Sequence, residues 1–80
     1  MTNPLHPLTN ELVERFAMAL KEKLLDAQIK YGFTDHWARL TDFDELRAAL
    51  ERHMDKGDPV DVAVYSMFLW HYGQMTRLPF

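Results

Sequence analysis

The 80-residue chain contains no cysteine and only three glycines. Without cysteine it has neither disulfide bonds nor cysteine-ligated metal sites, and a reducing cytoplasm is the expected location. Basic residues are also few, since nine Lys and Arg against twelve Asp and Glu give a net charge of −3. A non-specific nucleic-acid binder needs a basic face, so this balance argues against direct nucleic-acid binding. The opening residues are polar and interrupted by proline, and no signal peptide is expected.

Charge is missing altogether from residues 62–76, which contain no Asp, Glu, Lys or Arg. A helix built from this stretch is apolar on every side, and such a helix is normally buried all round. It is too short to cross a bilayer, which takes about 20 apolar residues, and no membrane contact is expected. Its surplus apolar surface predicts a homodimer, with a sticky face for another protein as the competing explanation. The residues expected at such an interface are Trp37, Tyr65, Phe68, Leu69, Trp70 and Tyr72.

The first half of the chain carries a clear helical pattern. Apolar residues recur at steps of four: Leu12, Phe16, Leu20 and Leu24. That spacing predicts an amphipathic helix from about Asn10 to Lys30. Thr9 or Asn10 is expected to cap it, and Gly32 to end it. Residues 1–8 contain two prolines and are expected to form an extended arm.

The clearest turn signal is Gly57-Asp58-Pro59. Glycine closes a helix in the left-handed conformation without steric cost, Asp is a favoured N-cap, and Pro is tolerated at the first helical position. One helix therefore ends near Lys56 and another begins at Pro59. Asp61, at the third helical position, is expected to reach back to the Asp58 N–H.

These signals together predict a single all-α domain over residues 1–80, a small three-helix bundle running up, down and up. The second helix begins after Thr41 or Asp42, and the third is about fifteen residues long. The connector 33–41 is too apolar for a free loop and is expected to fold back over the core, with room for one short helical turn. Residues 74–80 are expected to form an irregular tail.

Two carboxylate pairs have the spacing of a metal site. Glu11 and Glu14 lie on the first helix, and Asp58 and Asp61 on the third. If the two helices are parallel, both pairs lie at the same end, and four converging carboxylates would suit Mg²⁺. The competing explanation is ordinary N-terminal chemistry, because the helix dipole favours acidic residues there. A smaller alternative metal set combines Asp58 and Asp61 with His53.

Two stretches carry a resemblance: KLLDAQIKYGF at residues 23–33 followed by Trp37, and ALERHMDKGDPVDVAVYSMFLWHYG at residues 49–73. They resemble a group of small phage and prophage proteins in which an H-x-x-K-G-D-P-x-D-V-A core precedes an aromatic and methionine-rich helix. In this chain the core is His53, Lys56, Gly57, Asp58, Pro59, Asp61, Val62 and Ala63. Some members are labelled dATP/dGTP diphosphohydrolase-like, relatives of the MazG-type all-α pyrophosphohydrolases.

The resemblance implies a phage origin, an all-α fold and a location in the host cytoplasm. MazG-type enzymes hold Mg²⁺ with an E-x-x-E and an E-x-x-D pair on adjacent helices. Glu11 and Glu14 match the first pair, whereas Asp58 and Asp61 match the second only with Asp in place of Glu.

Two hypotheses of different class follow. The first is a non-enzymatic, cofactor-free interaction protein that binds a host or phage protein, as inhibitors of host defence such as anti-CRISPR proteins do. Residues 35–61, with eight acidic and four basic side chains, would give it a negative surface. The second is a Mg²⁺-dependent nucleoside-triphosphate pyrophosphohydrolase, or a nucleotide-binding remnant of one.

Overall fold

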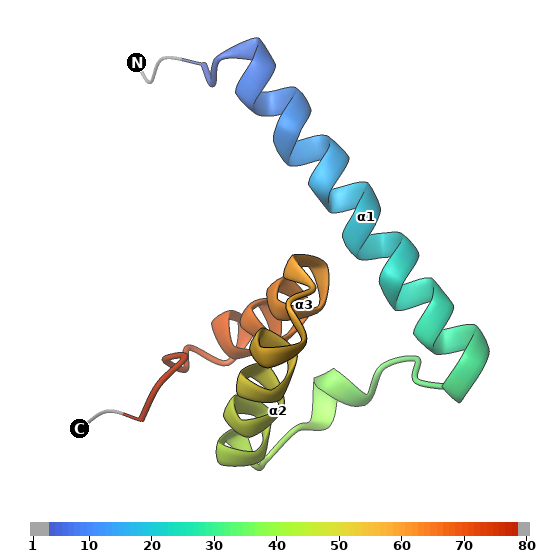
Figure 1. Ribbon diagram of the computed structural model, residues 1–80, viewed down its shortest axis with the longest axis vertical. Coiled ribbons are helices and arrows are strands. Elements are labelled where there is room, and N and C mark those ends of the chain that lie inside the picture. Colours follow the sequence, from blue (N-terminus) through green and yellow to red (C-terminus); the bar gives the residue numbers. More distant parts are fainter. Residues whose placement is uncertain (1–3, 79–80) are drawn as a thin grey trace.

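The computed structural model describes residues 4–78, and within them the regular structure is entirely helical. Three α-helices, α1 (Pro7–Tyr31), α2 (Phe43–Lys56) and α3 (Pro59–His71), are joined by short connections, with one 3₁₀ turn, η1 (His36–Arg39), between α1 and α2. The predicted all-α class and the three helices are confirmed. Helices α2 and α3 form a hairpin, and α3 also packs against α1 (Figure 1).

Helix α1 begins earlier than the sequence pattern predicts. Its first residue is Pro7, and the His6 Nδ1 atom accepts a hydrogen bond from the Leu8 N–H at 3.1 Å. Proline is tolerated at the first helical position because its missing N–H has no intrahelical partner there. The prediction that residues 7 and 8 belong to an extended arm was therefore wrong, and residues 1–3 of that arm lie outside the described part. Gly32, with φ of 74°, ends the helix as expected.

The turn between α2 and α3 follows the predicted chemistry. Gly57 ends α2 in the left-handed conformation, with φ of 85°. The Asp58 carboxylate caps α3 by accepting from the Val60 N–H at 2.9 Å. Asp61 does not serve the cap as expected, because its carboxylate lies 3.4 Å from the ammonium of Lys23 on α1.

Helix α2 starts as predicted, whereas α3 is shorter than predicted. Asp42 caps α2 through the Glu45 N–H at 3.0 Å. Helix α3 is 13 residues long, slightly shorter than expected.

The core is small and lies mainly inside the hairpin. Its buried side chains are Leu46, Leu50, Val64 and Leu69. Leu69 is fully buried, whereas its neighbour Trp70 is 79% exposed. Within one chain α2 and α1 leave part of the third helix uncovered, in line with the surplus of apolar surface expected for it. Helix α1 contributes no fully buried side chain among residues 4–78.

The connector between α1 and α2 folds back over the hairpin, as predicted. The Tyr72 hydroxyl, just beyond α3, accepts from the Leu40 N–H at 3.1 Å and donates to the Trp37 carbonyl. One phenol therefore fixes both the end of η1 and the approach to α2. The chain after α3 is irregular, and Arg47 on α2 holds it by donating to the Met75 carbonyl at 2.9 Å. Residues 79–80 of the expected tail lie outside the described part.

Candidate interaction surface

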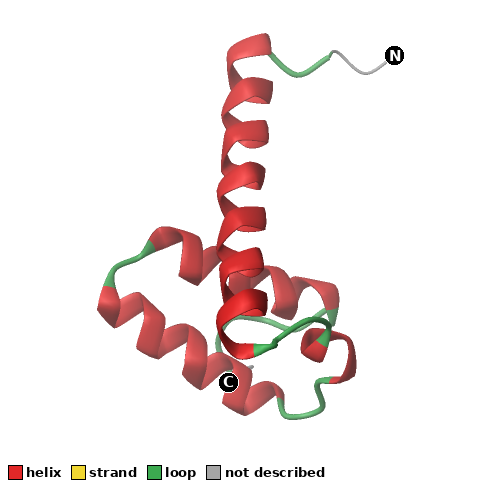
Figure 2. Ribbon diagram, turned by 90° about the vertical axis from the view of Figure 1, so that its right-hand side faces the viewer, coloured by secondary structure: helices red, strands yellow, loops and turns green. Residues whose placement is uncertain are grey.

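The N-terminal half of α1 stands clear of the hairpin. In Figure 2 the helix rises above α2 and α3, crossing them rather than running alongside, and Figure 1 shows the same separation from a perpendicular direction. The bundle is therefore open, because α1 meets α3 only with its C-terminal half. Lys23 marks this contact, since its ammonium lies 2.9 Å from the carboxylate of Asp58 at the start of α3.

One apolar row runs along nearly the whole of α1. Its members are four residues apart, so each is turned about 40° from the one before and the row winds about 160° round the helix from first to last. The members are Leu8, Leu12, Phe16, Leu20 and Leu24. Leu20 and Leu24, in the half that meets the hairpin, are partly buried. The other three, which we call the free ridge, are exposed by 70%, 56% and 38% in chain order. The row is therefore covered at one end and open to solvent at the other.

The size of the molecule reflects this open arrangement. The chain exposes 6645 Å² of accessible surface. A folded monomer of 9.5 kDa is expected to expose about 5,050 Å². The radius of gyration is 14.5 Å, against about 12 Å for a compact domain of this length. The surplus of about 1,600 Å² exceeds the roughly 800 Å² that one partner contributes to a standard protein interface.

The six residues expected at an interface differ in how much of each side chain is exposed. Leu69 is in the core and has no exposed surface to offer, which corrects its place in that set. Trp70 is on the surface, and Trp37 is 38% exposed. Tyr72 is partly buried and engaged with the connector.

Tyr65 and Phe68 are partly buried and, with Trp37, line an apolar cavity of about 270 Å³ beside the C-terminal half of α1. The Trp37 and Phe68 rings stack with centroids 6.3 Å apart. These aromatic side chains therefore connect α3 to the connector, and they leave the free ridge as the more exposed apolar surface.

The free ridge was only partly visible in the sequence. The step of four residues predicts Leu12 and Phe16 as members of a helical stripe, whereas the expected extended arm includes Leu8. The signal for it is the same step of four residues, which continues one turn before Leu12. A periodic pattern does not show how far a partner helix extends along the stripe, so the sequence alone leaves open which of its residues are covered.

The Lys23 ammonium bridges Asp58 and Asp61. It donates to Asp58 at 2.9 Å, and it lies 3.4 Å from Asp61. The hydrogen bond from Lys23, helped by the Val60 N–H, lowers the pKa of the Asp58 carboxyl, and the same bond raises the pKa of Lys23. His53 completes the group, with its Nδ1 atom 3.6 Å from Asp61 and without a hydrogen-bond partner. A protein cation already sits between the two aspartates.

The two carboxylate pairs are not brought together. Lys23, the α1 residue beside Asp58, follows Glu14 by nine residues and Glu11 by twelve. At 1.5 Å per helical residue, the pairs are separated by about 14 to 18 Å along α1. The expectation that both lie at the same end was wrong, because α3 starts beside the C-terminal half of α1, at Lys23, and not beside its N-terminus. Within residues 4–78, no three His, Asp or Glu side chains are grouped as metal ligands.

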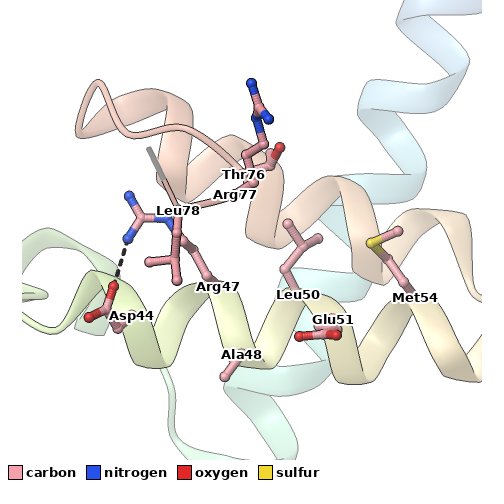
Figure 3. Close-up of a pocket in the computed structure, with 9 residues that line it drawn as sticks. All are labelled: Asp44, Arg47, Ala48, Leu50, Glu51, Met54, Thr76, Arg77 and Leu78. Carbon is pink, nitrogen blue, oxygen red and sulfur yellow. Dashed lines mark hydrogen bonds and ion pairs between the residues drawn. The ribbon is translucent and has the colours of Figure 1, made fainter. Parts of the chain in front are cut away.

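A groove of about 750 Å³ lies between α2 and the residues after α3 (Figure 3). Leu50 and Met54 supply apolar surface, and the charged side chains that line it are of both signs. Arg47 is already engaged there, because it donates to Asp44 at 2.9 Å and to Gln74 at 2.8 Å. The side chains of this groove therefore form a local polar network that holds the residues after α3 against α2.

Comparisons with protein-family models, with curated proteins and with solved structures gave no match. In the part of the chain that the structure describes, none of the helices combines the length and apolar character needed to span a membrane.

Proposed function

We propose that this chain is a small non-enzymatic interaction protein that binds another protein through the free ridge of α1. One observation carries the proposal: within residues 4–78 the apolar row continues for two turns beyond the hairpin, and its three members there are 38–70% exposed. Full burial of a large apolar side chain contributes about 1.5–3 kcal/mol, so covering Leu8, Leu12 and Phe16 gives a partner substantial binding energy. An apolar surface of this kind is typical of protein interaction sites.

The pyrophosphohydrolase alternative depends on four carboxylates around one Mg²⁺. In this structure Glu11 and Glu14 are remote from Asp58 and Asp61, and Lys23 occupies the space between the two aspartates. No observation favours that function over binding, and we do not propose it.

A phage origin and a partner in the host cytoplasm remain part of the proposal, supported by the resemblance of residues 23–33 and 49–73. The acidic side chains of residues 35–61 would add a negative surface on the connector and the hairpin. Such a surface favours a partner with a basic groove and repels acidic ones. Blocking a nucleic-acid-binding factor of the host is the form of inhibition that fits this charge.

The test compares three versions of the full chain: wild type, Leu12→Glu and Leu25→Glu. The control is closely matched, since Leu25 lies on the same helix and is 51% exposed against 56% for Leu12. It comes two residues after Lys23, about 200° round the helix from the side that meets α3. Circular dichroism should show the same helix content for all three.

Wild type and Leu25→Glu should associate with protein, whether a second copy or a component of a bacterial extract, and Leu12→Glu should not. Equal association by all three proteins would refute a binding role for the free ridge. Release of pyrophosphate from dNTPs with Mg²⁺, lost in Asp61→Ala with the fold retained, would refute the non-enzymatic assignment.

A further inference from the structure

We infer that the occupant of the free ridge is a second copy of this chain, with the two N-terminal halves of α1 antiparallel and centred on Leu12. This inference rests on the proposed function and names the occupant of the free ridge, while the acidic surface of residues 35–61 stays available to a host partner. In a two-fold pair each chain supplies the same patch, so the patch must be complementary to itself. The pattern of apolar and charged residues around Leu12 has that property.

The apolar residues match in the antiparallel register. We define the register by placing Leu12 of one chain opposite Leu12 of the other. Two residues, one from each chain, then lie at the same level when their residue numbers add up to 24. Leu8 of each chain then lies opposite Phe16 of its partner, so the small and the large side chain of the free ridge alternate across the interface. Alternation of this kind lets two apolar rows interdigitate.

The charges that border the row match in the same register. Glu11 and Arg15 are four residues apart and flank the row on one side, whereas Thr9 and Val13, both uncharged, flank it on the other. In an antiparallel pair the charged side of one helix meets the charged side of its partner. Glu11 of each chain then lies about one half-turn from Arg15 of the other, and at the same axial offset from Glu11 of the other. The register therefore sets two reciprocal ion pairs against one pair of like charges. A parallel pair would instead place the charged side against Thr9 and Val13.

The chain has surface for a partner to cover, and the hairpins do not obstruct the pairing. Each chain exposes about 1,600 Å² more than a compact monomer of its mass, spread over the whole molecule, and Leu8 and Leu12 on the free ridge are more than half exposed. Because the hairpin meets the C-terminal half of α1, where Leu20, Lys23 and Leu24 are partly buried, overlap of residues 7–17 leaves the two hairpins at opposite ends of the pair (Figure 2).

Exchanging the charges tests both the partner and the register. In Glu11→Lys the flank is wholly basic, and in Arg15→Glu it is wholly acidic. Each variant alone should therefore dimerise at least tenfold more weakly than wild type, measured as the dissociation constant in analytical ultracentrifugation. An equimolar mixture of the two should form a heterodimer, and the double variant Glu11→Lys/Arg15→Glu should return to within about threefold of wild type. Circular dichroism at each step checks that α1 stays helical.

Two results would overturn the inference. If the dissociation constant of the dimer does not change with the charge exchange, or if Leu12→Glu still dimerises, the interface lies elsewhere. A wild-type monomer at all concentrations, together with Leu12-dependent capture of a different protein, would replace the second copy by that protein and leave the proposed function intact. A wild-type chain that stays monomeric and captures no other protein would refute both this inference and the proposed function.

Discussion

Neighbouring residues on α3 provide a sharp test of the packing. Leu69 has no exposed surface and lies at the centre of the hairpin core, whereas Trp70 is 79% exposed. Leu69→Ala removes three buried carbon atoms and leaves a cavity, which costs about 3 kcal/mol. An 80-residue domain has a stability of about 4–12 kcal/mol, so this variant loses a large fraction of it. The expected fall in Tm is about 12–24 °C.

Trp70→Ala is the matched control, because it deletes a larger side chain one position along the same helix. Its stability should remain within about 0.5 kcal/mol of wild type. Urea unfolding followed by circular dichroism measures both variants, at one protein concentration so that self-association contributes equally. A loss below about 1 kcal/mol for Leu69→Ala, or above about 1.5 kcal/mol for Trp70→Ala, would refute the orientation of α3.

Two further predictions concern polar contacts between elements. Tyr72→Phe leaves the Leu40 N–H and the Trp37 carbonyl without their hydrogen-bond partner. It should lower the free energy of unfolding, measured in urea, by about 1–2 kcal/mol. An unchanged urea midpoint would show that the phenol does not hold the connector. The Asp58 carboxyl has a folded-state pKa below its ordinary 3.8, chiefly because Lys23 donates to it, so its contribution to stability is present above about pH 4 and is lost as the pH falls through the lowered pKa. Asp58→Asn should therefore weaken the dependence of the urea midpoint on pH in the acid range, and an unchanged dependence would contradict this coupling.

The features that the sequence predicted correctly are those encoded within a few residues. Gly57 and Asp58 specify the end of one helix and the start of the next through their own backbone and side-chain chemistry. Asp42 does the same for α2. The short helical turn in the connector also followed from local composition. At the start of α1 two local signals compete, and the His6-Pro7 cap prevails over Thr9 or Asn10.

The features that were missed depend on distant parts of the chain. Helix α3 is apolar on all sides, so periodicity does not distinguish Leu69, which faces α2, from Trp70, which faces solvent. Lys23 and Asp58 are 35 residues apart, and their pairing depends on where α1 crosses the hairpin. The same crossing separates Glu11 and Glu14 from the aspartates of α3 and leaves the free ridge exposed. None of this is determined by the pattern within one helix.

Sedimentation equilibrium across a range of concentrations tests the role of the free ridge most directly. Wild type and Leu25→Glu should converge on twice the chain mass of 9.5 kDa as concentration rises, while Leu12→Glu should remain at the mass of one chain. A mass of 9.5 kDa for wild type at every concentration would contradict pairing through α1. Equal masses for wild type and Leu12→Glu would show that the exposed half of α1 is not the surface through which the chains associate.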